Sequence, residues 1–181
     1  MRQLKIAVIL LVAVVLQSSL RTIWNPLVYL DLPLVVVVYF ALQRDPVQAV
    51  VIGTLAGLAT DVFSGAVLGT GGFSKTLTAY MIATLATRIM IDNPLARIPV
   101  LAGAVLIDAS VFFFLNRVFG QATRGPFVEI LSYSLIATTI AGTLILYLLD
   151  MLFSERARQR RQLAVRRRGA RRNPMRLGKR R

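Results

Sequence analysis

Long apolar blocks alternate with short polar connections along this chain. Six blocks can be drawn, and most are close to the roughly 20 residues that a membrane-spanning helix needs. They cover residues 4–20, 27–42, 47–63, 73–91, 98–119 and 127–153. The second block is short and rich in β-branched residues, yet we expect a helix there, because a lone strand would leave its backbone unpaired in lipid. The pattern therefore predicts an all-α membrane protein, a bundle of six transmembrane helices.

The connections between the blocks are short and carry residues that break helices. They contain Asn25-Pro26, Asp45-Pro46, Gly71-Gly72, Asn93-Pro94 and Gly125-Pro126. Such connections have no room for a soluble domain, so we expect residues 1–153 to form one transmembrane domain. No convincing internal repeat is visible, and the inverted halves of many secondary transporters are therefore not evident.

Charge separates this body from a tail at residues 154–181. The chain has 181 residues, is 56% hydrophobic and carries a net charge of +14. The tail holds 13 of the 22 Arg and Lys residues and one acid, Glu155. Basic segments resist translocation, so the tail should be cytoplasmic, and an even number of spans puts the N-terminus there too. The tail is expected to lie on anionic lipid. It has no aromatic residues on which bases could stack, so no specific nucleic acid is predicted.

Two further inferences come from composition and from the first block. The chain has no Cys and no His, which excludes disulfides, thiolate catalysis and any His-based zinc site. No cofactor and no metal are predicted, and an intramembrane enzyme is disfavoured. The first block follows a basic start and also has features of a signal peptide, but its length favours a retained helix.

Charged residues inside apolar blocks are the candidates for a site, because an unpaired charge in lipid is costly. Asp61 and Lys75 flank a glycine-rich turn, and a partly buried pair between them would form either an ion or substrate site or, as we favour, a brace. Asp108 lies near the middle of the fifth block, with Asn116 eight residues further on nearly the same helix face. These two residues predict a buried polar site for which the sequence names no partner.

Small residues at helical spacing mark two faces where helices can approach closely. Gly53 and Gly57 form one such face in the third block. Ala137 and Ala141, followed by Gly142, form another in the sixth block.

We expect these two faces to have different uses. The third block leads directly into the turn at Asp61, which favours packing inside the bundle. The sixth block adds Thr138 and Thr139, whose hydroxyls would hydrogen-bond across to an outside partner. That partner would be another protein or a second copy of the chain.

One ordered set of residues resembles the MreD family of rod-shape-determining membrane proteins. The set spans about 50 residues and comprises Asp31-Leu32, Tyr39, Ala41-Leu42, Pro46, Gly57-Leu58, Asp61, Ser64-Gly65, Leu68-Gly69 and Tyr80. Two features depart from the family pattern: Lys75 stands where many members have an uncharged residue, and the tail is unusually long and basic.

The resemblance implies a non-catalytic scaffold of the bacterial inner (cytoplasmic) membrane that crosses it several times. Its partner would be MreC, within the elongation machinery that joins MreB filaments to the peptidoglycan polymerase RodA and its class B penicillin-binding protein. The family is similar in layout to the S components of energy-coupling vitamin transporters. A small-molecule binding or transport module with a polar cavity around Asp108 is therefore the alternative, and a tightly bound ligand would favour it. A homodimer also stays open.

The resemblance also gives the glycine-rich turn a role. Asp61, Ser64, Gly65 and Gly69 are expected to form a structural turn, in which the Asp61 carboxylate accepts hydrogen bonds from backbone N–H groups. This turn would lie at the outer face, where the periplasmic part of MreC emerges. It would therefore serve for docking as well as bracing.

Overall fold

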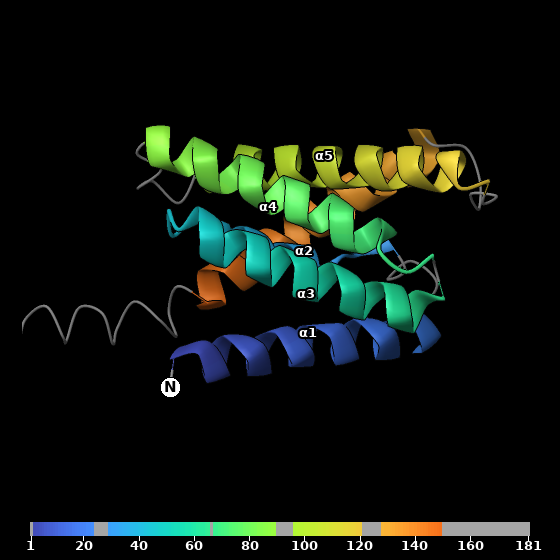
Figure 1. Cartoon of the computed structure of the whole chain (residues 1–181), viewed down its shortest axis with the longest axis horizontal. Helices are drawn as coiled ribbons and strands as arrows, with labels where there is room; N and C mark the ends of the chain where they lie inside the picture. Colours follow the sequence, from blue (N-terminus) through green and yellow to red (C-terminus); the bar gives the residue numbers. More distant parts are fainter. Residues whose placement is uncertain (1, 24–28, 66, 90–95, 121–127, 150–181) are drawn as a thin grey trace, which may run out of the picture. The chain divides into compact units, whose positions relative to one another are not determined.

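The computed structural model describes residues 2–23, 29–65, 67–89, 96–120 and 128–149, and in these residues every regular element is helical. The helices are α1 (Arg2–Ile23), α2 (Leu32–Ala41), α3 (Pro46–Ser64), α4 (Thr70–Arg88), α5 (Arg97–Val118) and a further helix at Val128–Leu149 (Figure 1). The prediction of an all-α membrane protein is confirmed. The basic tail lies outside the described residues, and the expectations about it stay predictions.

The chain divides into two compact units, Met1–Leu146 and Tyr147–Arg181. The packing described below is that of the first unit. It contains five complete helices and most of the helix that begins at Val128.

Three helices are long and apolar enough to cross a membrane by length and composition: Pro46–Ser64, Arg97–Val118 and Val128–Leu149. The apolar stretch within α1 is shorter, Ile6–Ser19. The number of membrane crossings therefore stays a prediction.

Helix α2 differs from the spanning segment that we predicted at residues 27–42. It has ten residues, which is about 15 Å of helix, about half the thickness of the hydrocarbon core. It begins at Leu32 because the Asp31 side chain caps it by accepting from the Leu34 N–H at 2.9 Å, and Pro33 follows in its first turn. A proline there fits, since that position needs no N–H donor.

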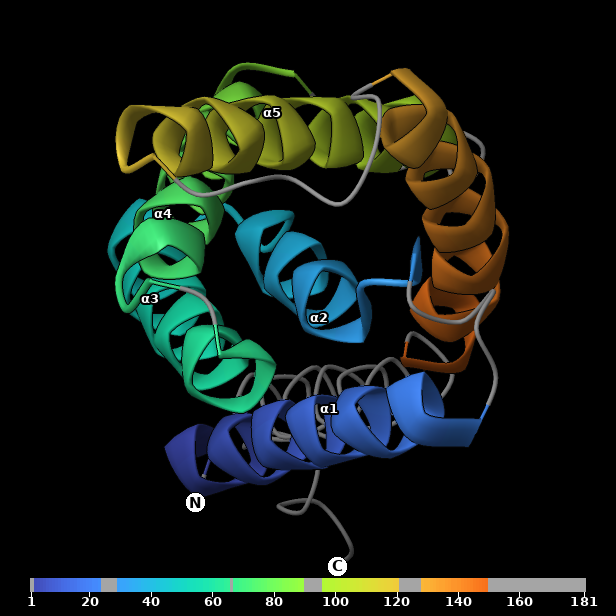
Figure 2. The same ribbon diagram turned by 90° about the vertical axis from the view of Figure 1, so that its right-hand side faces the viewer.

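The same helix lies at the centre of the first unit. Every residue from Pro33 to Ala41 is buried, and Figure 2 shows α2 in the middle of the other helices. A helix that is apolar all round can be buried on every face. Tyr39 follows this pattern and packs edge-on against Phe40, with ring centroids 5.3 Å apart.

The closest helix pair is the hairpin of α3 and α4, and glycines allow its approach. A side-chain carbon at Gly53 would lie 2.8 Å from the Lys75 carbonyl oxygen. One at Gly57 would collide with the backbone of Gly71 and Gly72, 2.5 Å from Cα of Gly72. These contacts place the small-residue face of α3 against α4.

Candidate functional site

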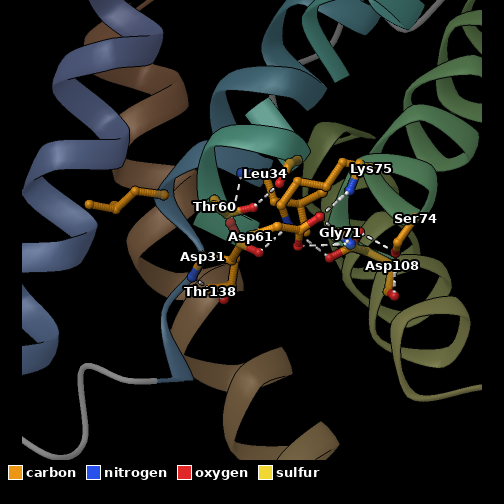
Figure 3. A network of polar contacts seen from close by, with 12 residues as sticks. Asp31, Leu34, Thr60, Asp61, Gly71, Ser74, Lys75, Asp108 and Thr138 are labelled. Carbon is orange, nitrogen blue, oxygen red and sulfur yellow. Dashed lines mark hydrogen bonds and ion pairs between the residues drawn. The ribbon is translucent and has the colours of Figure 1, made fainter. Parts of the chain in front are cut away.

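A buried lysine between two aspartates joins three helices (Figure 3). The Lys75 ammonium in α4 donates to Asp108 Oδ2 in α5 at 3.0 Å and to Asp31 Oδ2 at the start of α2. Side-chain exposure is 5% for Lys75, 11% for Asp108 and 24% for Asp31. We call these three residues the ion triad. Each carboxylate is paired, as a charge removed from water must be.

Further hydrogen bonds hold both aspartates of the ion triad. The Ser74 hydroxyl lies 2.6 Å from Asp108 Oδ1 and 2.7 Å from the Asp108 carbonyl oxygen. The other oxygen of Asp31 caps α2, so its charge also lies at the positive end of that helix. The ion triad therefore fixes how far α2, α4 and α5 can slide past one another.

The segment that leads into α2 is held from two sides. Gln17 of α1 donates to the Leu30 carbonyl, and its oxygen accepts from the Leu32 N–H at 2.9 Å. On the other side, Thr138 accepts from the Asp31 N–H at 3.2 Å and lies 3.3 Å from the Tyr29 carbonyl. Non-helical backbone at membrane depth needs such internal partners. With Lys75 of α4, polar side chains from three other helices thus bind the start of α2.

A second polar cluster lies at the turn between α3 and α4. Asp61 is 2% exposed, and its carboxylate accepts from the N–H groups of Gly69 at 2.8 Å, Gly71 at 2.9 Å and Gly72 at 3.1 Å. These are the orphan donors of the first turn of α4, and Asp61 caps them from the neighbouring helix. These are backbone hydrogen bonds of the kind that the resemblance implied for this turn.

Glycines shape the same turn. Gly65 ends α3 at φ +66° and Gly69 precedes α4 at φ +102°, both in the left-handed region that glycine adopts without strain. A side-chain carbon at Gly71 would collide with the Asp61 carboxylate. Ser64 is exposed and lies 3.4 Å from the Asp61 carbonyl oxygen. Whether the turn also docks a partner stays a prediction.

The predicted pair between Asp61 and Lys75 is wrong. Asp61 is engaged by backbone N–H groups, whereas Lys75 points to Asp31 and Asp108. Spacing along one hairpin suggested the pair, but Lys75 lies in the second turn of α4, on a face that meets α2 and α5. Composition indicates that a buried lysine needs buried acids, but it does not single out Asp31 and Asp108, since Glu129 and Asp150 also lie inside an apolar block.

Asp108 and Asn116 are both buried, but they do not form one polar site. Asp108 belongs to the ion triad. The Asn116 side chain instead donates to the Phe112 carbonyl of its own helix at 2.9 Å. The two residues lie at spacing that shares a helix face, but Asn side chains often hydrogen-bond to the backbone of their own helix, as Asn116 does here.

The expectation that Thr138 and Thr139 face an outside partner is also wrong. Thr138 is fully buried and binds the segment before α2. The Thr139 hydroxyl is buried as well. On the inner side of the same helix, a side-chain carbon at Gly142 would lie 2.6 Å from Leu101 and 2.9 Å from Val35. Ala137 and Ala141 are half-buried, beside the exposed Ile136 and Ile140.

The remaining residues of the family motif have separate positions. Pro46 is the first residue of α3, whose N-cap Asp45 accepts from the Gln48 N–H at 3.1 Å. Tyr80 lies on the exposed side of α4, 51% exposed. Neither contacts the ion triad, so the motif does not describe a single site.

Removing the Asp61 carboxylate should weaken the hairpin. Asp61→Ala leaves three glycine N–H groups without an acceptor, and a buried unpaired donor costs about 1–3 kcal/mol. We expect a clear drop in folded protein recovered from membranes, read by detergent size-exclusion chromatography. Asp61→Asn keeps one acceptor oxygen and should have a milder effect. Normal recovery and partner binding in Asp61→Ala would mean that Asp61 neither braces nor docks.

Comparison with known proteins gives one match. A family model described as rod shape-determining protein MreD matches residues 1–155. No curated protein and no solved structure matches the chain, so the likeness in layout to S components stays a prediction.

Proposed function

The chain belongs to the MreD family of rod shape-determining proteins, and from this membership we propose that it is a non-catalytic membrane scaffold that binds MreC. The scaffold would support the cell-wall elongation machinery and so help control cell shape and peptidoglycan synthesis. Contacts with RodA, the class B penicillin-binding protein and MreB would be direct or pass through MreC.

The observation that supports this proposal is that the buried charged side chains bind other parts of the same chain. Lys75 is held by two carboxylates, and the Asp61 carboxylate is held by three backbone N–H groups. The three acids that the structure buries or half-buries therefore join one helix to another or cap a helix. Such an arrangement favours a rigid body that presents its outer faces to a partner.

A partner of this body must bind mostly within the bilayer, because the sequence leaves few residues between the helices for contacts elsewhere. Apolar side chains drive little association between helices in lipid, so the contact has to come from close packing. On the helix at Val128–Leu149, exposed Ile136 and Ile140 form a ridge, and half-buried Ala137 and Ala141 lie beside it. A single helix of MreC, or a second copy of the chain, would fit a ridge into this shallow strip.

Replacing Ala137 and Ala141 with Leu should release the partner and leave a folded protein. The larger side chains fill the strip against which the partner helix packs. Copurification from native membranes, followed by detergent size-exclusion chromatography, measures both outcomes. Gly142→Leu is the matched control, since the neighbouring position packs inward and should lose folded protein instead. If the double Ala variant retains its partner, this face is not the interface.

The proposed location is the bacterial inner membrane, with several crossings and both termini cytoplasmic. Support comes from the basic residues of the tail, which resist translocation and favour anionic lipid on the cytoplasmic side. A reporter fused after Arg181 should show a cytoplasmic location, and a reporter inserted in the turn at Gly69 should show a periplasmic location. A periplasmic C-terminus would contradict this topology.

One observation supports a second candidate, a small-molecule binding module. The ion triad surrounds the start of a short central helix, and binding sites of membrane transporters are often built around such interrupted helices. The two candidates differ in what copurifies with the protein, a partner chain or a small molecule.

A further inference from the structure

We propose that Arg44, Arg88 and Arg97 form a binding surface for the headgroup of an anionic glycerophospholipid. The surface is part of the membrane body and is separate from the basic tail. It rests on the register of three helices, on the exposure of their arginines and on the unusual backbone at Arg44.

The ion triad sets the register. Asp31 at the start of α2 binds Lys75 in the second turn of α4. Short connections join α2 to α3 and α3 to α4, and α3 runs opposite to both neighbours, so α2 and α4 run in the same direction (Figure 1). Arg44 and Arg88 each lie 13 residues beyond their member of this pair. At 1.5 Å per residue, Arg88 is about 20 Å from Lys75 along α4.

Helix α5 brings the third arginine to the same end. Helix α5 runs antiparallel to α4, and Asp108, near the middle of α5, binds Lys75. Arg97 is the first residue of α5 and lies 11 residues before Asp108, which is about 16 Å along the helix. Figure 1 shows the end of α4 and the start of α5 at the same side as the connection between α2 and α3. The three arginines therefore share one level at one end of the first unit.

The separation of this level from the opposite end fits a headgroup region. Helix α4 has 19 residues from Thr70 to Arg88, about 28 Å. The hydrocarbon core of a bilayer is about 30 Å thick. If the glycine-rich turn lies at one membrane–water interface, the three arginines therefore lie at the opposite interface.

The side chains are placed for such a contact. Arg44 and Arg88 are exposed, and Arg97 is half-exposed. A guanidinium presents several N–H donors in a fork that matches two oxygens of a phosphate.

The backbone at Arg44 is a second, independent observation. Arg44 has φ +67° and is the one non-glycine residue with positive φ in the part of the chain that the structure describes. It lies two residues beyond Leu42, the C-cap of α2, in a backbone region that glycine adopts without strain. A strained arginine at a position suited to glycine points to a use for its charge.

The test is position-specific labelling of the full chain by a lipid. The protein is placed in nanodiscs of phosphatidylcholine with a minor fraction of phosphatidylglycerol that carries a photoactivatable headgroup. After illumination and pepsin digestion, mass spectrometry maps the labelled peptides. We expect labelling around Arg44, Arg88 and Arg97 to exceed labelling around Arg117, an exposed arginine near the other end of α5.

The double variant Arg44→Gly, Arg88→Gln should lower labelling at this surface about fivefold or more. Glycine suits the backbone at position 44, so this variant is expected to fold. Arg117→Gln is the matched control and should leave the labelling at the surface unchanged. Equal labelling at both ends of the body, labelling confined to the tail, or no change in the double variant would each overturn the proposal.

Discussion

Lys75→Met should remove most of the folded protein. The substitution leaves Asp31 and Asp108 near each other without the cation that both bind. Breaking a buried ion pair from one side costs about 3–5 kcal/mol, because an uncompensated charge stays behind. That loss is a large part of the 5–15 kcal/mol that stabilises an average domain. The amount of monodisperse protein recovered from membranes in a mild detergent measures the effect.

Neutralising the whole ion triad is the control for charge. The triple variant Asp31→Asn, Lys75→Met, Asp108→Asn carries no buried charge at these positions, and Asn at position 31 still caps α2. We expect it to recover much of the folded protein that Lys75→Met loses, since a neutral replacement of a buried ion pair is often tolerated. Equal recovery of Lys75→Met and the unaltered protein would show that the ion triad contributes nothing to the fold.

Replacing Gly53 and Gly57 with Leu should also abolish the folded protein. The new side chains would clash with backbone atoms of α4, which cannot move by a change of rotamer. The clash at Gly53 is with the Lys75 carbonyl oxygen, and the clash at Gly57 is with Gly71 and Gly72. The helices would have to separate, and with them the Asp61 cap. Overpacking of this kind costs about 1–3 kcal/mol for each site, and more when the obstacle is backbone.

Gly103→Leu is the matched substitution for this test. Gly103 also lies inside a helix, α5, yet no atom lies within 4 Å of the place that a side-chain carbon would take. Leu is a much better helix former than Gly, so Gly103→Leu should leave the yield unchanged or raise it. A folded variant with Leu at Gly53 and Gly57 would mean that α3 and α4 do not pack as described.

Residue patterns predicted the helices well because each depends on local sequence. Five of the apolar blocks overlap long helices, and breakers such as Asp45-Pro46 lie where helices begin. For Asp61, spacing alone suggested a pair with Lys75, and only the resemblance to the family implied the hydrogen bonds from backbone N–H groups that the structure has. The length of α2 could not be predicted from local sequence, because the positions of its ends depend on the cap at Asp31 and on complete burial by other helices.

The contacts of the ion triad could not be predicted from the sequence, for a different reason. Its residues are separated by 44 and 33 positions along the chain, and the contacts depend on which helices are neighbours. Periodicity shows which residues share a helix face, as for Asp108 and Asn116, but not which helix that face meets. The same limit explains why the prediction for Thr138 is wrong: its side chain does not face outward but binds the segment at the start of α2.

The most direct test of the proposed scaffold is native mass spectrometry of the full chain purified from its own membranes under mild conditions. Masses in the spectrum identify both bound chains and bound small molecules in one measurement. The account predicts a complex whose added mass is MreC, lost in the variant with Leu at Ala137 and Ala141. A protein without MreC that carries a stoichiometric small molecule, released when Asp108 is replaced by Asn, would contradict it.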